Sequence, residues 1–143
     1  AVEQIARQAF NDYYGHYHAD PRLDRQKSDE AYASWAVRSC LDRQVADEML
    51  IADVDGVVAG FFAMQMLNPQ DGTGVISGVA QAYRKLGIYR SFVINTLKWI
   101  QEQNGERVVF STQVNNIPVQ KVWARLGFTM AHSSYTFHKW FDK

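Results

Sequence analysis

The residues from Ser77 to Arg90 combine basic side chains with a glycine at the point where a predicted strand passes into a predicted helix. A helix N-terminus offers backbone N–H groups that have no intrahelical acceptor, together with the positive end of the helix dipole, and phosphate groups bind there readily. Gly87 lets the backbone approach a pyrophosphate closely, and Arg84, Lys85 and Arg90 add positive charge. The segment therefore predicts a pyrophosphate site, and an ordinary strand-to-helix turn with solvated cations is the alternative.

A second segment follows about 30 residues downstream, and two motifs in order are more specific than either alone. A predicted strand over 107–114 leads into the pattern Asn116-x-x-Val119-x-x-Val122-Trp123-x-x-Leu126-Gly127-Phe128. Together with Val79-x-x-x-x-Arg84-x-x-Gly87, this pattern resembles the GNAT acetyltransferase superfamily, whose motifs are (Q/R)-x-x-G-x-(G/A) and N-x-x-A-x-x-(L/A)-Y-x-x-x-G-F. The match departs from the family at Tyr89, where a small residue is usual, and at Trp123, where a tyrosine is usual.

The resemblance implies an enzyme that uses acetyl-CoA as co-substrate and lets a primary amine attack the acetyl thioester directly. Strand 75–80, splayed from the strand at 107–114, would orient the thioester, and the Val79 backbone N–H would stabilise the developing oxyanion. The residues that it implies for binding acetyl-CoA are Val79, Gln81, Arg84, Lys85, Leu86, Gly87, Ile88, Tyr89, Arg90 and Asn116.

The leaving thiolate needs a proton or another form of stabilisation. The family often uses a tyrosine of the last helix as the acid, but an indole N–H at Trp123 cannot replace it. We therefore expect Tyr135 to act as the acid, with Tyr83 as a substitute, because a phenol has a pKa of about 10. The alternatives are a half-buried strand residue for Tyr135 and a core aromatic, or a wall of the pantetheine site, for Trp123.

The attacking ammonium must also lose a proton, and histidine titrates near neutrality. His18 is the expected general base, and His16 and Asp20 of the same loop are further candidates. A polar surface loop, in which Asp20 pairs with Arg22, is the alternative for each of them. A water chain to solvent would leave no essential base.

The segment from His16 to Leu23, followed by a helix with Tyr32 and Trp35, resembles the acceptor side of acetyltransferases that act on nucleotide-linked amino sugars, of the dTDP-fucosamine type. The predicted function is therefore transfer of an acetyl group to a small-molecule amine, with amino sugars as the first acceptor class. Two alternatives stay open: a CoA-binding sensor or interaction domain without catalysis, and an enzyme for a longer acyl-CoA.

These residues need a scaffold that positions them, and hydrophobic periodicity predicts one. Helices are expected from Val2 to about Gly15, from Ser28 or Asp29 onward, from Gly87 to about Gly105, and from Asn115 or Asn116 to Gly127. The second helix should bury Tyr32, Trp35, Ala36, Cys40 and Leu41. Strands are expected over 49–54, 57–66, 75–80 and 107–114, with a hairpin turn at Asp55-Gly56 and two further strands within 128–141. This order predicts an α/β (α+β) fold: a mixed, mostly antiparallel sheet flanked by helices.

Length and charge limit the possible functions. The 143 residues suit a single domain over 1–143, and a formal net charge of zero argues against a broad nucleic-acid or anionic-membrane surface. The single cysteine excludes an internal disulfide, no Cys/His spacing indicates a metal site, and no apolar run reaches the roughly 18 residues of a membrane span. We expect a cytoplasmic protein and leave a homodimer open. Because GNAT domains usually begin with a strand, we expect an abbreviated domain or a piece of a longer chain.

Overall fold

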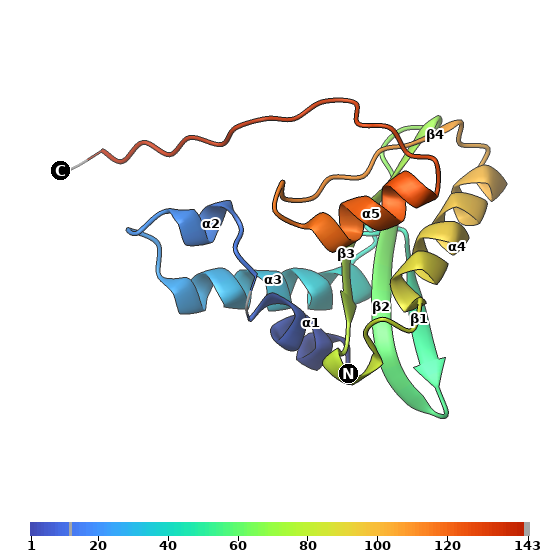
Figure 1. Cartoon of the computed structure of the whole chain (residues 1–143), viewed down its shortest axis with the longest axis horizontal. Helices are drawn as coiled ribbons and strands as arrows, with labels where there is room; N and C mark the ends of the chain where they lie inside the picture. Colours follow the sequence, from blue (N-terminus) through green and yellow to red (C-terminus); the bar gives the residue numbers. More distant parts are fainter. Residues whose placement is uncertain (12, 142–143) are drawn as a thin grey trace.

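The computed structural model describes residues 1–11 and 13–141. Its elements follow the chain in this order: α1 (Val2–Phe10), α2 (His16–Ala19), α3 (Arg25–Leu41), β1 (Glu48–Val54), β2 (Val57–Met66), β3 (Asp71–Val79), the short 3₁₀ helix η1 (Gln81–Tyr83), α4 (Ile88–Glu102), β4 (Arg107–Val108) and α5 (Ile117–Arg125). The four strands form one sheet in the order β1-β2-β3-β4 (Figure 1). The predicted class, a mixed and mostly antiparallel sheet flanked by helices, is confirmed.

Consecutive antiparallel pairing joins the first three strands, whereas β4 pairs with β3 in parallel. The hairpin between β1 and β2 turns at Asp55 and Gly56, whose φ angles are 53° and 81°. A two-residue turn that matches the twist of the strands needs positive φ at both positions, which is why Asp-Gly is a strong hairpin signal. The predicted turn is confirmed.

Strand β2 is buried on both faces of the sheet. Neighbouring side chains of a strand point to opposite sides of the sheet, so the side chains of β2 enter two separate core clusters. Phe61 and Ala63 contribute to a first core cluster, beneath α1 and α3, that consists of Ile5, Ala6, Ala36, Ala46, Phe61, Ala63 and Ile76. Phe62 and Met64 contribute to a second core cluster with Phe92 and Val93 of α4. Figure 1 shows α1 and α3 on one side of the sheet and α4 on the other.

Helix α3 begins earlier than predicted, because Asp24 rather than Ser28 or Asp29 caps it by accepting a hydrogen bond from the Lys27 N–H. Its buried face consists mainly of small residues: Ser28, Tyr32, Ala33, Ala36 and Ser39. The prediction that Trp35, Cys40 and Leu41 are buried was therefore wrong. Small side chains let α1 and α3 pack closely, so the large apolar residues of α3 lie outside the contact.

The second half of the chain contains less strand than predicted. Strand β4 covers Arg107–Val108 instead of 107–114, and 128–141 forms an extended tail without the two predicted strands. Met130, Tyr135 and Phe137 of this tail are each nearly 90% exposed. The alternating pattern of the tail suits a strand, but a strand also requires a ladder partner, and the described residues provide none.

None of the helices in the described part of the chain is both long and apolar enough to cross a lipid bilayer.

Candidate functional site

The loop between β3 and α4 has the backbone conformation that the sequence predicts for a phosphate site. Gly87 precedes the first residue of α4 with a left-handed φ of 83°, and Lys85 is also left-handed at 67°. The first helical hydrogen bond of α4 runs from the Ser91 N–H to the Gly87 carbonyl, and no side chain caps the helix. The N–H groups of residues 88–90 therefore precede the hydrogen-bonded ladder of α4 and can bind an anion.

Positive charge surrounds this helix end. Lys85 and Arg90 are exposed, and among the described residues neither forms an ion pair. The Arg84 Nε donates to the Val79 carbonyl at 3.3 Å, which ties the loop back to the end of β3. A Cβ added at Gly87 would meet no atom within 4 Å, so the approach to the helix end is open. These residues fit the pyrophosphate of CoA.

The seam between β3 and β4 is short. The two strands pair only through Asp71–Gly72 and Arg107–Val108, and an ion pair between Arg107 and Asp71 closes this end of the seam. The hydrogen bond from Arg107 holds the pKa of the Asp71 carboxyl below its usual value. The last hydrogen bond in the described seam runs from the Thr73 hydroxyl to the Val109 carbonyl at 2.7 Å. Beyond it, β3 has no ladder partner on this side within the described chain.

Val79 lies on this open edge of β3. Gly60 and Val79 are partners across β2 and β3, and the next bond runs from the Ala80 N–H to the Ala59 carbonyl at 2.9 Å. That bond makes Gly60 and Val79 a non-hydrogen-bonded pair, in which the backbone N–H and C=O point away from the partner strand. The Val79 N–H therefore points away from β2, toward the side from which β4 has diverged, as an oxyanion donor requires.

The two departures from the GNAT motifs contact each other. The Trp123 indole N–H of α5 donates to the Tyr89 hydroxyl of α4 at 3.1 Å. Burial raises the pKa of Tyr89 to about 12, while the bond from Trp123 acts in the opposite direction. The rings of Phe62 and Phe110 pack beside this pair. The sequence indicated each departure separately, but the spacing gave no sign that they meet across 34 residues.

His18, the expected base, is held inside the loop. Its side chain is 1% exposed, its Nε2 lies 2.8 Å from an Asp29 carboxylate oxygen, and its Nδ1 accepts the Gly15 N–H at 3.2 Å. With Nδ1 as acceptor, the ring proton lies on Nε2 and points to Asp29, so neither nitrogen has a lone pair for a substrate proton. This placement does not favour the predicted role of His18. The side chain of His16 lies outside the described part of the chain.

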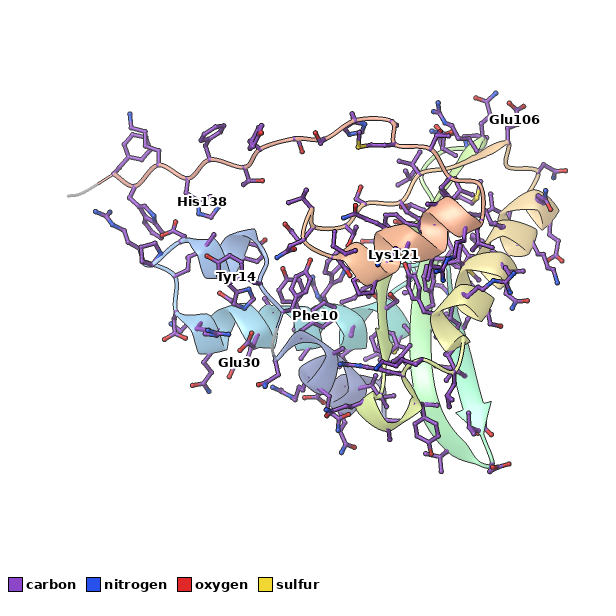
Figure 2. All side chains as sticks on the ribbon, in the orientation of Figure 1. Phe10, Tyr14, Glu30, Glu106, Lys121 and His138 are labelled. Carbon is purple, nitrogen blue, oxygen red and sulfur yellow. The ribbon has the colours of Figure 1, made fainter. Side chains whose placement is uncertain are left out.

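Asp20, another candidate base, anchors the tail instead. Its carboxylate accepts bonds from the Arg22 N–H at 2.9 Å, His138 Nδ1 at 2.6 Å and Trp140 Nε1 at 2.9 Å. The bond from the Arg22 backbone, followed by that from His138, lowers the pKa of Asp20. A carboxylate with three donors and a low pKa is a poor proton acceptor. Figure 2 shows His138 on the part of the tail that passes α2.

Tyr135, the expected acid, lies on this tail with 89% of its surface exposed. Figure 1 shows the tail running along the edge of the molecule opposite the loop before α4, so the structure does not bring Tyr135 to the helix end. Tyr83, its substitute, belongs to η1 beside the loop.

The remaining predicted binding residues divide into two groups. Gln81 and Leu86 are exposed within the β3–α4 loop, and Ile88 is half-buried in the first turn of α4. Asn116 lies in a different place, at the start of α5, where its side chain donates to the Thr112 hydroxyl at 2.9 Å instead of capping the helix.

A model of the family described as "Acetyltransferase (GNAT) family" matches residues 3–128. The spore coat polysaccharide biosynthesis protein SpsD of Bacillus subtilis (strain 168) is 25% identical over 141 residues, which are 98% of this chain. The chain spans only 47% of the length of that relative.

Solved structures share the fold. A transcriptional regulator from Bacillus halodurans C-125 superposes with a TM-score of 0.67 at 18% identity, covering 96% of this chain and 93% of that one. The aminoglycoside acetyltransferase AAC(6')-Iy, in complex with the bisubstrate analog CoA-S-monomethyl-acetylneamine, superposes with a TM-score of 0.61 at 19% identity, covering 97% and 92%.

Proposed function

Because the chain belongs to the GNAT acetyltransferase family, we propose that it transfers an acetyl group from acetyl-CoA to a primary amine of a small molecule. The observation that supports this most is the pairing of two features at one place. An uncapped helix end with exposed cations lies at Gly87, and an outward-facing backbone N–H lies at Val79, where β3 has lost its neighbour.

Each feature has a chemical task. The N–H groups of residues 88–90, with Lys85 and Arg90, bind the pyrophosphate of acetyl-CoA. The open edge of β3 offers backbone groups to the amide-containing pantetheine arm, and the Val79 N–H donates to the carbonyl oxygen as it gains negative charge. A fixed donor aimed at developing charge typically contributes a factor of about 10² to 10³ to the rate.

We propose an amino sugar, free or nucleotide-linked, as the acceptor class. Two similarities support it: the match to a polysaccharide biosynthesis protein, and the shared fold with an enzyme whose bisubstrate analog joins CoA to acetylneamine. The segment from α2 to α3 adds exposed basic residues, Arg22, Arg25 and Lys27, suited to an anionic acceptor.

A CoA-binding sensor without catalysis is the second candidate, and one observation favours it. In the described structure, neither His18 nor Asp20 is available as a base, because each is engaged in hydrogen bonds. A sensor would bind CoA at the same helix end and release no thiol.

A thiol-release screen tests the proposal. Acetyl-CoA is supplied with amino sugars, nucleotide-linked amino sugars, polyamines and peptides, and CoA affinity is measured separately by calorimetry. We expect tight binding and release of thiol with an amino sugar. Binding without thiol release from any amine would favour the sensor, and absence of CoA binding would overturn both functions.

A further inference from the structure

The Tyr89 hydroxyl has a proton that no group in the described part of the chain accepts. A phenol can accept a hydrogen bond and donate one. The Trp123 N–H donates to this oxygen at 3.1 Å, and that bond uses only its accepting capacity. Because burial raises the pKa of Tyr89 to about 12, the hydroxyl keeps its proton at neutral pH. Tyr89 is half-buried, so its unused donor is open to water or to a bound acceptor.

The surroundings of the hydroxyl would bring it to an acceptor in the proposed acyl-CoA site. Tyr89 is the second residue of α4, directly after the anion-binding end at Gly87. Its ring packs 6.1 Å from that of Phe62 on β2, and Phe62 in turn contacts Phe110, which follows β4. The phenol therefore extends from the phosphate end toward the region where β3 and β4 diverge.

We propose that Tyr89 is the proton donor to the sulfur of the leaving CoA thiolate, and that Trp123 is the positioning residue that fixes its hydroxyl. This inference rests on the proposed acetyl transfer. The amine nitrogen bonds to the acetyl carbon, the carbon–sulfur bond breaks, and its electron pair stays on sulfur. Sulfur then takes the Tyr89 proton, and the tyrosinate recovers a proton from the newly formed N-acetyl ammonium through water.

The Trp123 indole assists the proton transfer to sulfur through its hydrogen bond to the Tyr89 oxygen. A Trp123 N–H that already points at the oxygen stabilises the negative charge as the phenol ionises, which lowers the cost of giving up the proton. Tyr135, by contrast, is 89% exposed on the tail, and its ring contact is with Phe137 of the same segment.

The first test removes the hydroxyl and keeps the ring. We expect Tyr89→Phe to lower kcat by about 100-fold, in the usual range for a general acid, while the CoA dissociation constant changes little. Tyr14→Phe, which removes a hydroxyl from a half-exposed tyrosine of the loop after α1, is the matched control and should keep the wild-type rate. A wild-type kcat for Tyr89→Phe overturns the inference and leaves the proposed function intact. A wild-type chain that releases no thiol overturns the function itself.

The second test separates a positioning role from packing. If Trp123 acts through the Tyr89 hydroxyl, Trp123→Phe should lower kcat by about 10-fold in the wild type and have no further effect on the rate in Tyr89→Phe, since coupled residues are not additive. Thermal unfolding of all four proteins reports packing independently. Additive losses in kcat would assign Trp123 a purely structural role and overturn that half of the proposal.

Discussion

Two substitutions at Gly87 test separately its left-handed backbone conformation and its position beside the proposed phosphate site. Its φ of 83° disfavours any side chain, yet a Cβ would meet no atom within 4 Å. We therefore expect Gly87→Ala to cost about 1–2 kcal/mol of stability from backbone strain and to keep most CoA affinity. Gly87→Asp has no more strain than Gly87→Ala, because aspartate tolerates left-handed backbone better than alanine, and it adds a negative charge beside the proposed phosphate site, so it should abolish binding.

Calorimetric titration with CoA distinguishes the two variants, and chemical denaturation reports their stabilities. Equal CoA affinities for Gly87→Ala and Gly87→Asp would show that no phosphate lies near this residue, and the pyrophosphate assignment would have to be abandoned.

The chemistry of single residues was predictable where it depends on neighbours in the chain. Arg84 and Gly87 act within one loop, and their spacing was sufficient to predict the helix end. His18 and Asp20 have the right side chains for a base, but their roles are set by Asp29, His138 and Trp140, which are 11, 118 and 120 residues away. No local pattern contains those contacts.

At the scale of elements, the tail from 128 to 141 is attached to the α2 region through Asp20. We expect Asp20→Asn to weaken the bonds to His138 and Trp140, because a neutral amide is a weaker acceptor than a carboxylate. Trypsin should then cleave after Lys139 several-fold faster than in the wild type. His132→Gln changes an exposed residue of the same tail and should leave the cleavage rate unchanged.

Acid should release the tail in the same way. The folded-state pKa of Asp20 lies below its usual value of 3.8. The stabilisation that the ionised Asp20 carboxylate provides through its bonds to the tail is therefore present above the unfolded-state pKa, and it is lost as pH falls through the folded-state pKa. The NMR signal of the Trp140 indole N–H should therefore shift in acid, below about pH 4. A signal that stays constant through this titration would contradict the contact with Asp20.

Elements were predictable where short-range turn chemistry defines them. Asp55-Gly56 and Gly87 lie at the boundaries that the sequence indicated, because positive φ restricts the choice of residue. Helix α3 was misjudged because its contact face uses Ala33, Ala36 and Ser39, which a search for large apolar residues ignores. The tail has the alternation of a strand, but pairing depends on a partner elsewhere in space.

At the scale of the whole molecule, CoA should act as a stabiliser, since a ligand that binds only the folded state raises its stability. At a free concentration of about 100 times the Kd, the gain is about 2.7 kcal/mol. For a chain of this size that raises Tm by roughly 5–10 °C. Differential scanning calorimetry should show the shift in the wild type and none in Gly87→Asp; an equal shift in both would place the ligand elsewhere.

The two core clusters also determine the order in which parts of the chain can fold during synthesis. Every member of the first cluster, from Ile5 to Ile76, is present once the ribosome has released β3, and the three strands beneath it pair with their immediate neighbours in sequence. The second cluster needs Phe92 and Val93 of α4, and its outer layer extends to Phe128. Half of the molecule can thus be assembled on the emerging chain before residues 85–90, which we propose bind the phosphates, have left the ribosome.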